Sequence, residues 1–256
     1  MSDLLSYETR GTGPGLVLVH GTGSTGPGSW GTVLDRLSAE HTVVLPDLPG
    51  SGDSPLPDGP PDIDTVADRI AATARAAGLD EFVVAGASLG APLAIKVAAR
   101  HPRRVRGLAT VVGYARLRTT LRLNLELWAA LHARGGRELG TFLTGLTFSE
   151  EYLAALPPEA VGQIAQRFGG PPTPGTAAQI AFTLGIDVRD ELAAVRVPTL
   201  VVAATGDRFV APEHSAEIAA GIAGARLVRV TGGHASVFED PGQTADALLG
   251  FLDGLG

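Results

Sequence analysis

Three polar residues that together could cleave an acyl bond each follow a short apolar run of the sequence. Ser88 stands in the Gly-Ala-Ser-Leu-Gly segment at residues 86–90, directly after the apolar run at residues 81–85. Asp207 follows a later apolar run and His234 follows the predicted strand at residues 226–230, and both stand at glycine-containing turns. A hydroxyl, a carboxylate and an imidazole in this chain order can perform nucleophilic attack with general-base help. We therefore predict that Ser88 is a nucleophile, His234 its base and Asp207 the carboxylate that orients the base.

A second glycine-rich segment, at residues 20–23, could stabilise negative charge on a substrate oxygen. Its glycines allow backbone N–H groups to point into a cleft, so the N–H groups of Thr22 and Leu89 are the predicted donors of an oxyanion hole. For His20 we expect a structural role, in which its ring holds the loop through hydrogen bonds. Asp47, in a turn after another strand, is expected to hold the adjoining loops. The segment lacks the Lys-Ser/Thr ending of a phosphate-binding loop, which argues against nucleotide binding.

Each member of the predicted triad also has a plainer interpretation. Ser88 could be an ordinary N-terminal helix cap, Asp207 a turn carboxylate and His234 an exposed loop histidine. Three placements at strand ends in the expected order are harder to explain in that way. If Asp207 does not reach the imidazole, Asp187 and Asp190 are the nearest alternative acids in the sequence.

The elements that must position these residues alternate along the chain. Short β-branched runs, nearly all of them continuously apolar, indicate parallel strands buried on both faces, and stretches of helical spacing separate them. The predicted strands are residues 16–19, 42–45, 81–85, 105–112, 199–203 and 226–230. The predicted helices are residues 30–37, 63–77, 89–100, 212–223 and 244–255. This alternation predicts the α/β fold class, with a mostly parallel central sheet flanked by helices.

The alternation stops between about residue 114 and residue 185. We predict a core of residues 1–114 and 186–256 and a helical cap of residues 115–185 that covers part of the core as a lid. Its leucine and aromatic content predicts an apolar substrate pocket. The predicted substrate-binding residues are Trp128, Leu131, Phe142, Leu146, Phe148, Arg116 and Arg122. The two arginines could clamp a substrate carboxylate, although a solvated helix face is the plainer interpretation.

Composition excludes several functional classes. A chain of 256 residues with 45% hydrophobic and 18% charged residues is typical of one large globular domain or of a core with an insertion. The net charge of −7 argues against nucleic-acid binding, which depends on clustered Lys and Arg. The sequence has no cysteine and no histidine pair at metal-ligand spacing, so neither a metal nor a cofactor is predicted.

The expected setting is the bacterial cytoplasm. The N-terminal residues lack the pattern of a secretory signal, and no apolar run reaches the ~20 residues that cross a bilayer. Lys96 is the single lysine among 20 Lys and Arg residues, which is typical of a GC-rich genome. We expect a partner that is a small molecule with an apolar portion, and neither a nucleic acid nor a membrane.

Taken together, the segments HGTG, DLPGSGDS, GASLG, GDRFVAP and GGHASVFEDP resemble the α/β-hydrolase fold superfamily. The resemblance spans roughly residues 15–251 and implies a lidded serine hydrolase that cleaves an ester, thioester or lactone bond through an acyl-enzyme intermediate. Dehalogenase-like and epoxide-hydrolase-like members carry Asp where this chain has Ser88. The HGTGSTGPGSW segment is similar to the oxyanion loop of carbon–carbon bond hydrolases that act on meta-cleavage products. Those relatives usually carry an aromatic residue where Ala235 follows His234.

Other functions remain open at this point. A lyase or cyclase of the same fold would use the site to shape a small, secondary-metabolite-like molecule, and a carbon–carbon bond hydrolase would use it to cleave one. A ligand-binding receptor with slow turnover would keep the pocket and lose the chemistry. Multiple turnover of an activated ester distinguishes the enzyme from the receptor.

Overall fold

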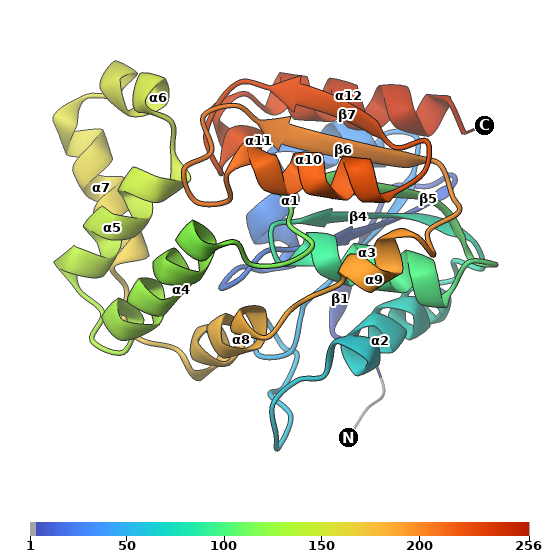
Figure 1. Cartoon of the computed structure of the whole chain (residues 1–256), viewed down its shortest axis with the longest axis horizontal. Coiled ribbons are helices and arrows are strands. Elements are labelled where there is room, and N and C mark those ends of the chain that lie inside the picture. The colour runs from blue at the N-terminus through green and yellow to red at the C-terminus, as the bar shows by residue number, and fades with distance from the viewer. Residues whose placement is uncertain (1–3, 256) are drawn as a thin grey trace.

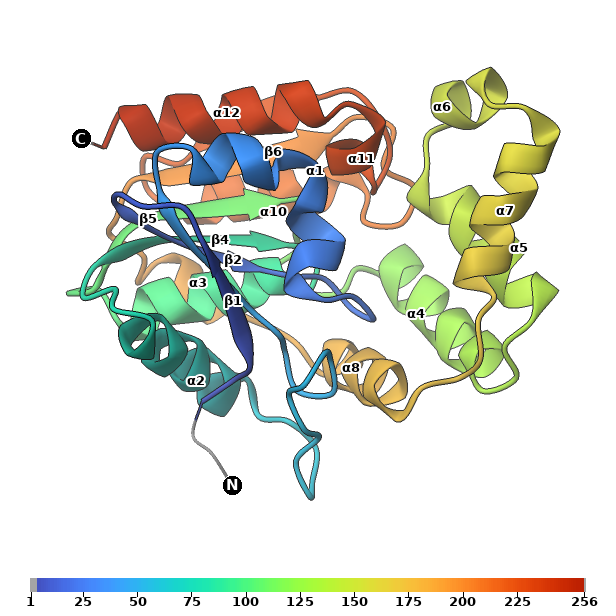
Figure 2. The ribbon, with the colours of Figure 1, turned by 180° about the vertical axis from the view of Figure 1, so that it is seen from behind.

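A mixed sheet with helices on both faces forms the centre of the molecule (Figures 1 and 2). The computed structural model describes residues 4–255. Within them the strands are β1 Tyr7–Arg10, β2 Gly15–Val19, β3 Thr42–Pro46, β4 Phe82–Ala87, β5 Val105–Val111, β6 Thr199–Ala204 and β7 Arg226–Val230. Their order across the sheet is β1-β3-β2-β4-β5-β6-β7, and every neighbouring pair except β1–β3 is parallel. The predicted α/β class and all six predicted strands are confirmed.

β1 is the strand that sequence patterning missed. It lies at the edge of the sheet, antiparallel to β3, with Tyr7 opposite Pro46. Three of its four residues are exposed, and it contains both Glu8 and Arg10. An edge strand of this kind has no continuous apolar run, because it pairs with a single neighbouring strand and neither of its faces is fully buried.

The central strands send alternate side chains into two separate hydrophobic layers. In β2, Leu16 and Leu18 belong to one layer and Val17 and Val19 to the other. Figures 1 and 2 show α1, α11 and α12 over one face of the sheet and α2, α3 and α10 over the other. The helices of this part are α1 Gly26–Ser38, α2 Ile63–Ala76, α3 Gly90–Arg100, α9 Arg189–Leu192, α10 Pro212–Gly221, α11 Ser236–Glu239 and α12 Pro241–Asp253.

Local capping sequences set where several of these helices begin. The Thr25 side chain accepts a hydrogen bond from the Gly28 N–H at the start of α1, and Asp62 accepts one from the Thr65 N–H at the start of α2. α1 begins at Gly26 rather than at the predicted residue 30. The apolar periodicity starts only at Trp30, so it did not reveal the first turn.

Residues 119–184, between β5 and β6, form a group of helices at one end of the sheet, on the left in Figure 1. These are α4 Thr119–His132, α5 Arg137–Thr147, α6 Glu150–Ala155, α7 Pro158–Phe168 and α8 Pro174–Leu184. The chain leaves and re-enters the sheet side by side, because the Val188 N–H donates to the Ala115 carbonyl at 2.8 Å. The division into core and cap stays a prediction, and residues 1–3 and 256 of the predicted core lie outside the described residues.

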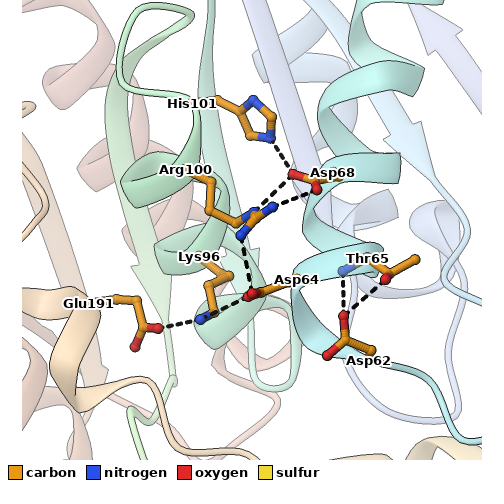
Figure 3. Close-up of polar contacts among 8 residues, drawn as sticks. All are labelled: Asp62, Asp64, Thr65, Asp68, Lys96, Arg100, His101 and Glu191. Carbon is orange, nitrogen blue, oxygen red and sulfur yellow. Dashed lines mark hydrogen bonds and ion pairs between the residues drawn. The ribbon is translucent and has the colours of Figure 1, made fainter.

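A network of charged side chains ties α2, α3 and α9 together (Figure 3). Lys96 of α3 pairs with Asp64 of α2 at 2.9 Å and with Glu191 of α9. Arg100, one turn further along α3, pairs with Asp64 at 3.1 Å and with Asp68 at 2.7 Å. Lys96 is only 12% exposed, so its two carboxylate partners compensate much of the cost of burying its charge.

Candidate active site

Ser88 lies at the tight turn from β4 into α3. Its φ is 53°, a left-handed conformation that non-glycine residues rarely adopt. Glycines on either side make the turn possible, because a Cβ built on Gly86 would lie 2.0 Å from the Gly90 carbonyl oxygen and one built on Gly90 2.2 Å from the Val19 carbonyl oxygen. The strain is held in place by surrounding backbone, including a 3.0 Å bond from the Ser88 N–H to the Val111 carbonyl.

Ser88, His234 and Asp207 form a continuous hydrogen-bonded array. The His234 Nε2 atom lies 3.0 Å from the Ser88 Oγ atom, and its Nδ1 atom lies 2.8 Å from the Asp207 Oδ2 atom. Because an ionised carboxylate only accepts hydrogen bonds, we assign the neutral ring proton to Nδ1 and leave Nε2 to accept from the Ser88 hydroxyl. An array of this kind can take up the hydroxyl proton as the oxygen attacks a carbonyl carbon.

The Asp207 carboxylate is held by backbone N–H groups as well as by the imidazole of His234. Its other oxygen accepts the N–H groups of Phe209 and Val210 at 2.9 and 2.8 Å. The Asp207 side chain is 1% exposed and that of His234 13% exposed, so the histidine separates the buried acid from the surface. Asp187, one alternative acid, is paired with Arg189 at 2.6 Å instead.

The predicted oxyanion loop, residues 20–23, lies directly against Ser88. A Cβ built on Gly21 would be 3.2 Å from the Ser88 Cβ atom and 3.7 Å from its Oγ atom. Within residues 4–255, no acceptor is bonded to the N–H of Thr22 or to that of Leu89, so both groups can donate to a substrate. The position of the loop fits the predicted oxyanion hole, whose role remains a prediction.

His20 and Asp47 hold this loop from below, as expected. The His20 Nδ1 atom bonds the Gly21 carbonyl at 2.8 Å, and its Nε2 atom accepts the Leu48 N–H at 2.8 Å. Complete burial lowers the pKa of His20 to about 4, against the opposing effect of its bond to Gly21. Asp47 accepts the Gly26 N–H at 3.0 Å, which anchors the start of α1.

Two residues of α8 that the sequence analysis did not identify also contact the oxyanion loop. The buried Gln179 accepts the Gly23 N–H at 2.8 Å through its amide oxygen. Its amide nitrogen donates to the Pro49 carbonyl at 3.0 Å and to the Ser51 hydroxyl at 2.8 Å. The Thr183 hydroxyl lies 3.2 Å from that of Thr22. Both residues occupy the buried side of a helix in the cap segment, where nothing in the local sequence distinguishes them from packing residues.

Apolar side chains from the cap segment reach the histidine through one aromatic intermediary. The Trp128 ring packs edge-to-face on the Phe209 ring with centroids 5.7 Å apart, and Phe209 packs on the His234 ring at 5.1 Å. Phe148 stacks on Tyr152 at 5.3 Å. The other apolar residues of the predicted pocket are Leu131, Phe142 and Leu146. They pack in or against the larger hydrophobic layer, which is the one that contains Val17 and Val19 of β2. Trp128 is therefore the predicted pocket residue whose ring is connected to that of His234 through a single aromatic neighbour.

The two predicted substrate-binding arginines have other partners in the structure. Arg116 pairs with Glu217 at 2.8 Å and lies in an isolated antiparallel bridge with Asp187. Arg122 is exposed on α4 and donates to the Leu184 carbonyl at 3.4 Å. Neither is brought to Ser88 by these contacts, so the solvated-face interpretation fits Arg122, and Arg116 is already neutralised by a carboxylate.

Comparison with known proteins assigns the family. The family profile of the alpha/beta hydrolase fold matches residues 14–241, and the chain belongs to this family. It is 30% identical over 250 residues to a pyrrolizixenacetamide deacetylase of Xenorhabdus hominickii, covering 97% of this chain and 94% of the relative. It is 31% identical over 266 residues to a pimeloyl-[acyl-carrier protein] methyl ester esterase of Stenotrophomonas maltophilia, covering 98% and 97%.

A solved structure agrees with this assignment. The enol-lactonase of Burkholderia xenovorans superposes with a TM-score of 0.84 at 26% identity, covering 97% of this chain and 96% of that one. The fold and the related sequences support hydrolase activity for this chain. Among the helices formed by residues 4–255, none combines the length and the apolar character that crossing a bilayer requires.

Proposed function

We propose that the protein is a serine hydrolase that cleaves an ester, thioester or lactone bond of a small molecule with an apolar portion. The observation that carries this proposal is the array in which His234 reaches Ser88 at 3.0 Å and Asp207 at 2.8 Å. A methyl ester esterase and an enol-lactonase among the similar proteins support the same bond class.

The reaction divides into two acyl transfers. Ser88 Oγ attacks the substrate carbonyl carbon while His234 Nε2 takes the hydroxyl proton, and the N–H groups of Thr22 and Leu89 bind the resulting oxyanion. When the intermediate collapses, the bond to the leaving group breaks and the imidazolium returns its proton to that group. Water, deprotonated by His234, then attacks the acyl-enzyme, and the acid product leaves with Ser88 regenerated.

The substrate preference follows from the surroundings of the histidine. Trp128 and Phe209 provide an apolar surface beside His234, and the larger hydrophobic layer continues from there into the cap segment. Binding of small molecules derives mainly from buried apolar area, so this surface favours substrates with an alkyl or aryl portion.

The direct test combines covalent labelling with turnover of p-nitrophenyl butyrate. A fluorophosphonate should add one adduct, located at Ser88 by peptide mass spectrometry, and Ser88→Ala should lower kcat on the order of 10⁴-fold or more. Ser215→Ala is the matched control, because Ser215 is a buried serine of α10 that lies outside the array. Labelling at another residue, or full turnover by Ser88→Ala, would overturn the proposal.

A further inference from the structure

A short stretch of the cap segment, residues 147–149, is bonded to both loops that carry the proposed acid and base. From the loop after β6, the Arg208 guanidinium donates to the Phe148 carbonyl at 3.0 Å. From the loop after β7, the Ala235 N–H donates to the Thr147 carbonyl at 2.8 Å. The two loops therefore meet the cap segment at one place.

Glu239, the last residue of α11, provides the third and most concentrated link. Its Oε1 atom accepts the Gly233 N–H at 3.0 Å and the Ser149 N–H at 2.9 Å. Its Oε2 atom accepts the hydroxyl of Ser149, which is only 3% exposed. One carboxylate thus joins the residue before His234 to the residue that caps α6.

The loop and the cap segment approach each other closely at this point. A Cβ built on Gly233 would lie 2.6 Å from the Ser149 nitrogen and 2.8 Å from the Thr147 carbonyl oxygen. No side chain fits there. A shift of the cap segment must therefore move the loop with it.

We propose that Glu239 is a positioning residue that couples the placement of the cap segment to the orientation of His234. The inference rests on the proposed function. The peptide before His234 is held through Glu239, and the peptide after it is held by Thr147. The imidazole must keep hydrogen-bonding geometry to Ser88 and to Asp207 at once, and misplacement of a reacting group by about 1 Å can cost on the order of 100-fold in rate.

The chemistry of the three bonds predicts which substitution at this position rescues activity. All three partners of Glu239 donate to it, so the side chain must supply acceptors. Glutamine keeps one oxygen for the two backbone N–H groups, and its amide nitrogen can donate to the Ser149 hydroxyl oxygen. Alanine supplies nothing and leaves two backbone donors without a partner.

The test is a comparison of kcat and KM on p-nitrophenyl butyrate, with each rate expressed per folded, fluorophosphonate-titratable site. Glu239→Ala should lower kcat about 10- to 100-fold with little change in KM, and Glu239→Gln should keep most of the wild-type kcat. Gln243→Ala is the matched control, because Gln243 binds the Thr231 N–H of the same loop at 3.0 Å without contacting the cap segment. This control should lose thermal stability and keep its kcat.

A variant on the cap side tests the coupling itself. Ser149→Ala removes one of the three donors to Glu239 and should lower kcat less than Glu239→Ala does. The double variant should be no slower than Glu239→Ala alone, because both substitutions break the same link. Losses that multiply in the double variant would mean that the two residues act independently, which overturns the inference.

Running Ser88→Ala in the same turnover assay, with its rate expressed per folded chain because it has no titratable serine, separates the two proposals. If Ser88→Ala is inactive and folded Glu239→Ala turns over at the wild-type rate, or loses no more than Gln243→Ala, the inference about Glu239 is wrong and the proposed function stands. If Ser88→Ala keeps its turnover, both are wrong. Should Glu239→Ala fail to fold, a wild-type kcat in Ser149→Ala overturns the coupling.

Discussion

At the scale of single residues, the turn that carries Ser88 leaves no space for a side chain at Gly86. A Cβ there would lie 2.0 Å from a backbone oxygen, which cannot swing away as a flexible side chain can. We expect Gly86→Ala to lower the free energy of unfolding by about 1–3 kcal/mol and to reduce ester turnover, because the backbone must shift to admit the methyl group. Denaturant unfolding and a turnover assay measure the two effects.

Gly31→Ala is the matched control for this prediction. Gly31 lies in α1 and a Cβ there would meet no atom within 4 Å. In a helix interior alanine is favoured over glycine by roughly 0.5–1 kcal/mol, so this variant should be more stable than the wild type and equally active. Destabilisation of similar size in both variants would contradict the explanation from close packing.

At the scale of elements, α8 holds the oxyanion loop through one buried amide. Gln179 satisfies the Gly23 N–H and two acceptors near Pro49 with a single side chain. Gln179→Leu keeps a similar volume, removes the acceptor of the Gly23 N–H and leaves the buried Pro49 carbonyl without its donor, at a cost of about 1–3 kcal/mol in unfolding free energy. We expect a lower kcat as well, because the loop carries the proposed Thr22 donor.

An exposed position of the same helix provides the comparison for that variant. Ala181→Ser should change kcat little, because Ala181 is exposed on α8 whereas Gln179 is buried. The readout is kcat on a p-nitrophenyl ester alongside the denaturation midpoint. Unchanged kcat in Gln179→Leu would show that α8 does not support the loop during turnover.

The elements that carry the predicted triad could be found from the sequence because their signal is local. Continuous apolar runs indicate parallel strands, and parallel strands end at the same edge of a sheet, so Ser88, Asp207 and His234 were expected to converge. The structure brings them into hydrogen-bonding contact. Gln179 and Glu239 could not be found in this way, because their partners are backbone groups far away in the chain or hidden in a turn.

At the scale of the whole molecule, stability toward acid depends on a histidine that must stay neutral. Burial depresses the pKa of His20 from 6.5 to about 4. Between pH 6.5 and pH 4, His20 is protonated in the unfolded chain but neutral in the folded protein. The contribution of neutral His20 to the unfolding free energy is therefore present above pH ~6.5 and is lost as the pH falls toward 4. The size of the loss is about 3 kcal/mol.

His20→Asn isolates this contribution, since asparagine also offers an N–H donor group and an acceptor but does not titrate. Between pH 7 and pH 4, the wild type should lose about 3 kcal/mol more unfolding free energy than the variant does. Urea unfolding at several pH values measures both slopes. Parallel curves for the two proteins would mean that His20 is not the group responsible.

The global architecture was more predictable than its margins. The sheet and its flanking helices could be predicted because apolar runs alternate with stretches of helical spacing. The exposed, charged β1 has no such run, and the first turn of α1 consists largely of Gly and Pro, so neither could be predicted. The predicted arginine clamp stays a prediction. The partner of Arg116 could not be found from the local sequence, because Glu217 belongs to α10, a helix that lies far away in the sequence.

The paired stems at Ala115 and Val188 bear on how such a protein can diversify. An excursion whose two ends are already fastened together adds little closure entropy as it lengthens, roughly 0.6 kcal/mol for each doubling. Natural recombination or protein engineering can therefore replace the segment between Ala115 and Val188 with a cap of another length or shape. The strands of the sheet would keep their register, and new substrates could be acquired without changing the loops that carry Ser88, Asp207 and His234.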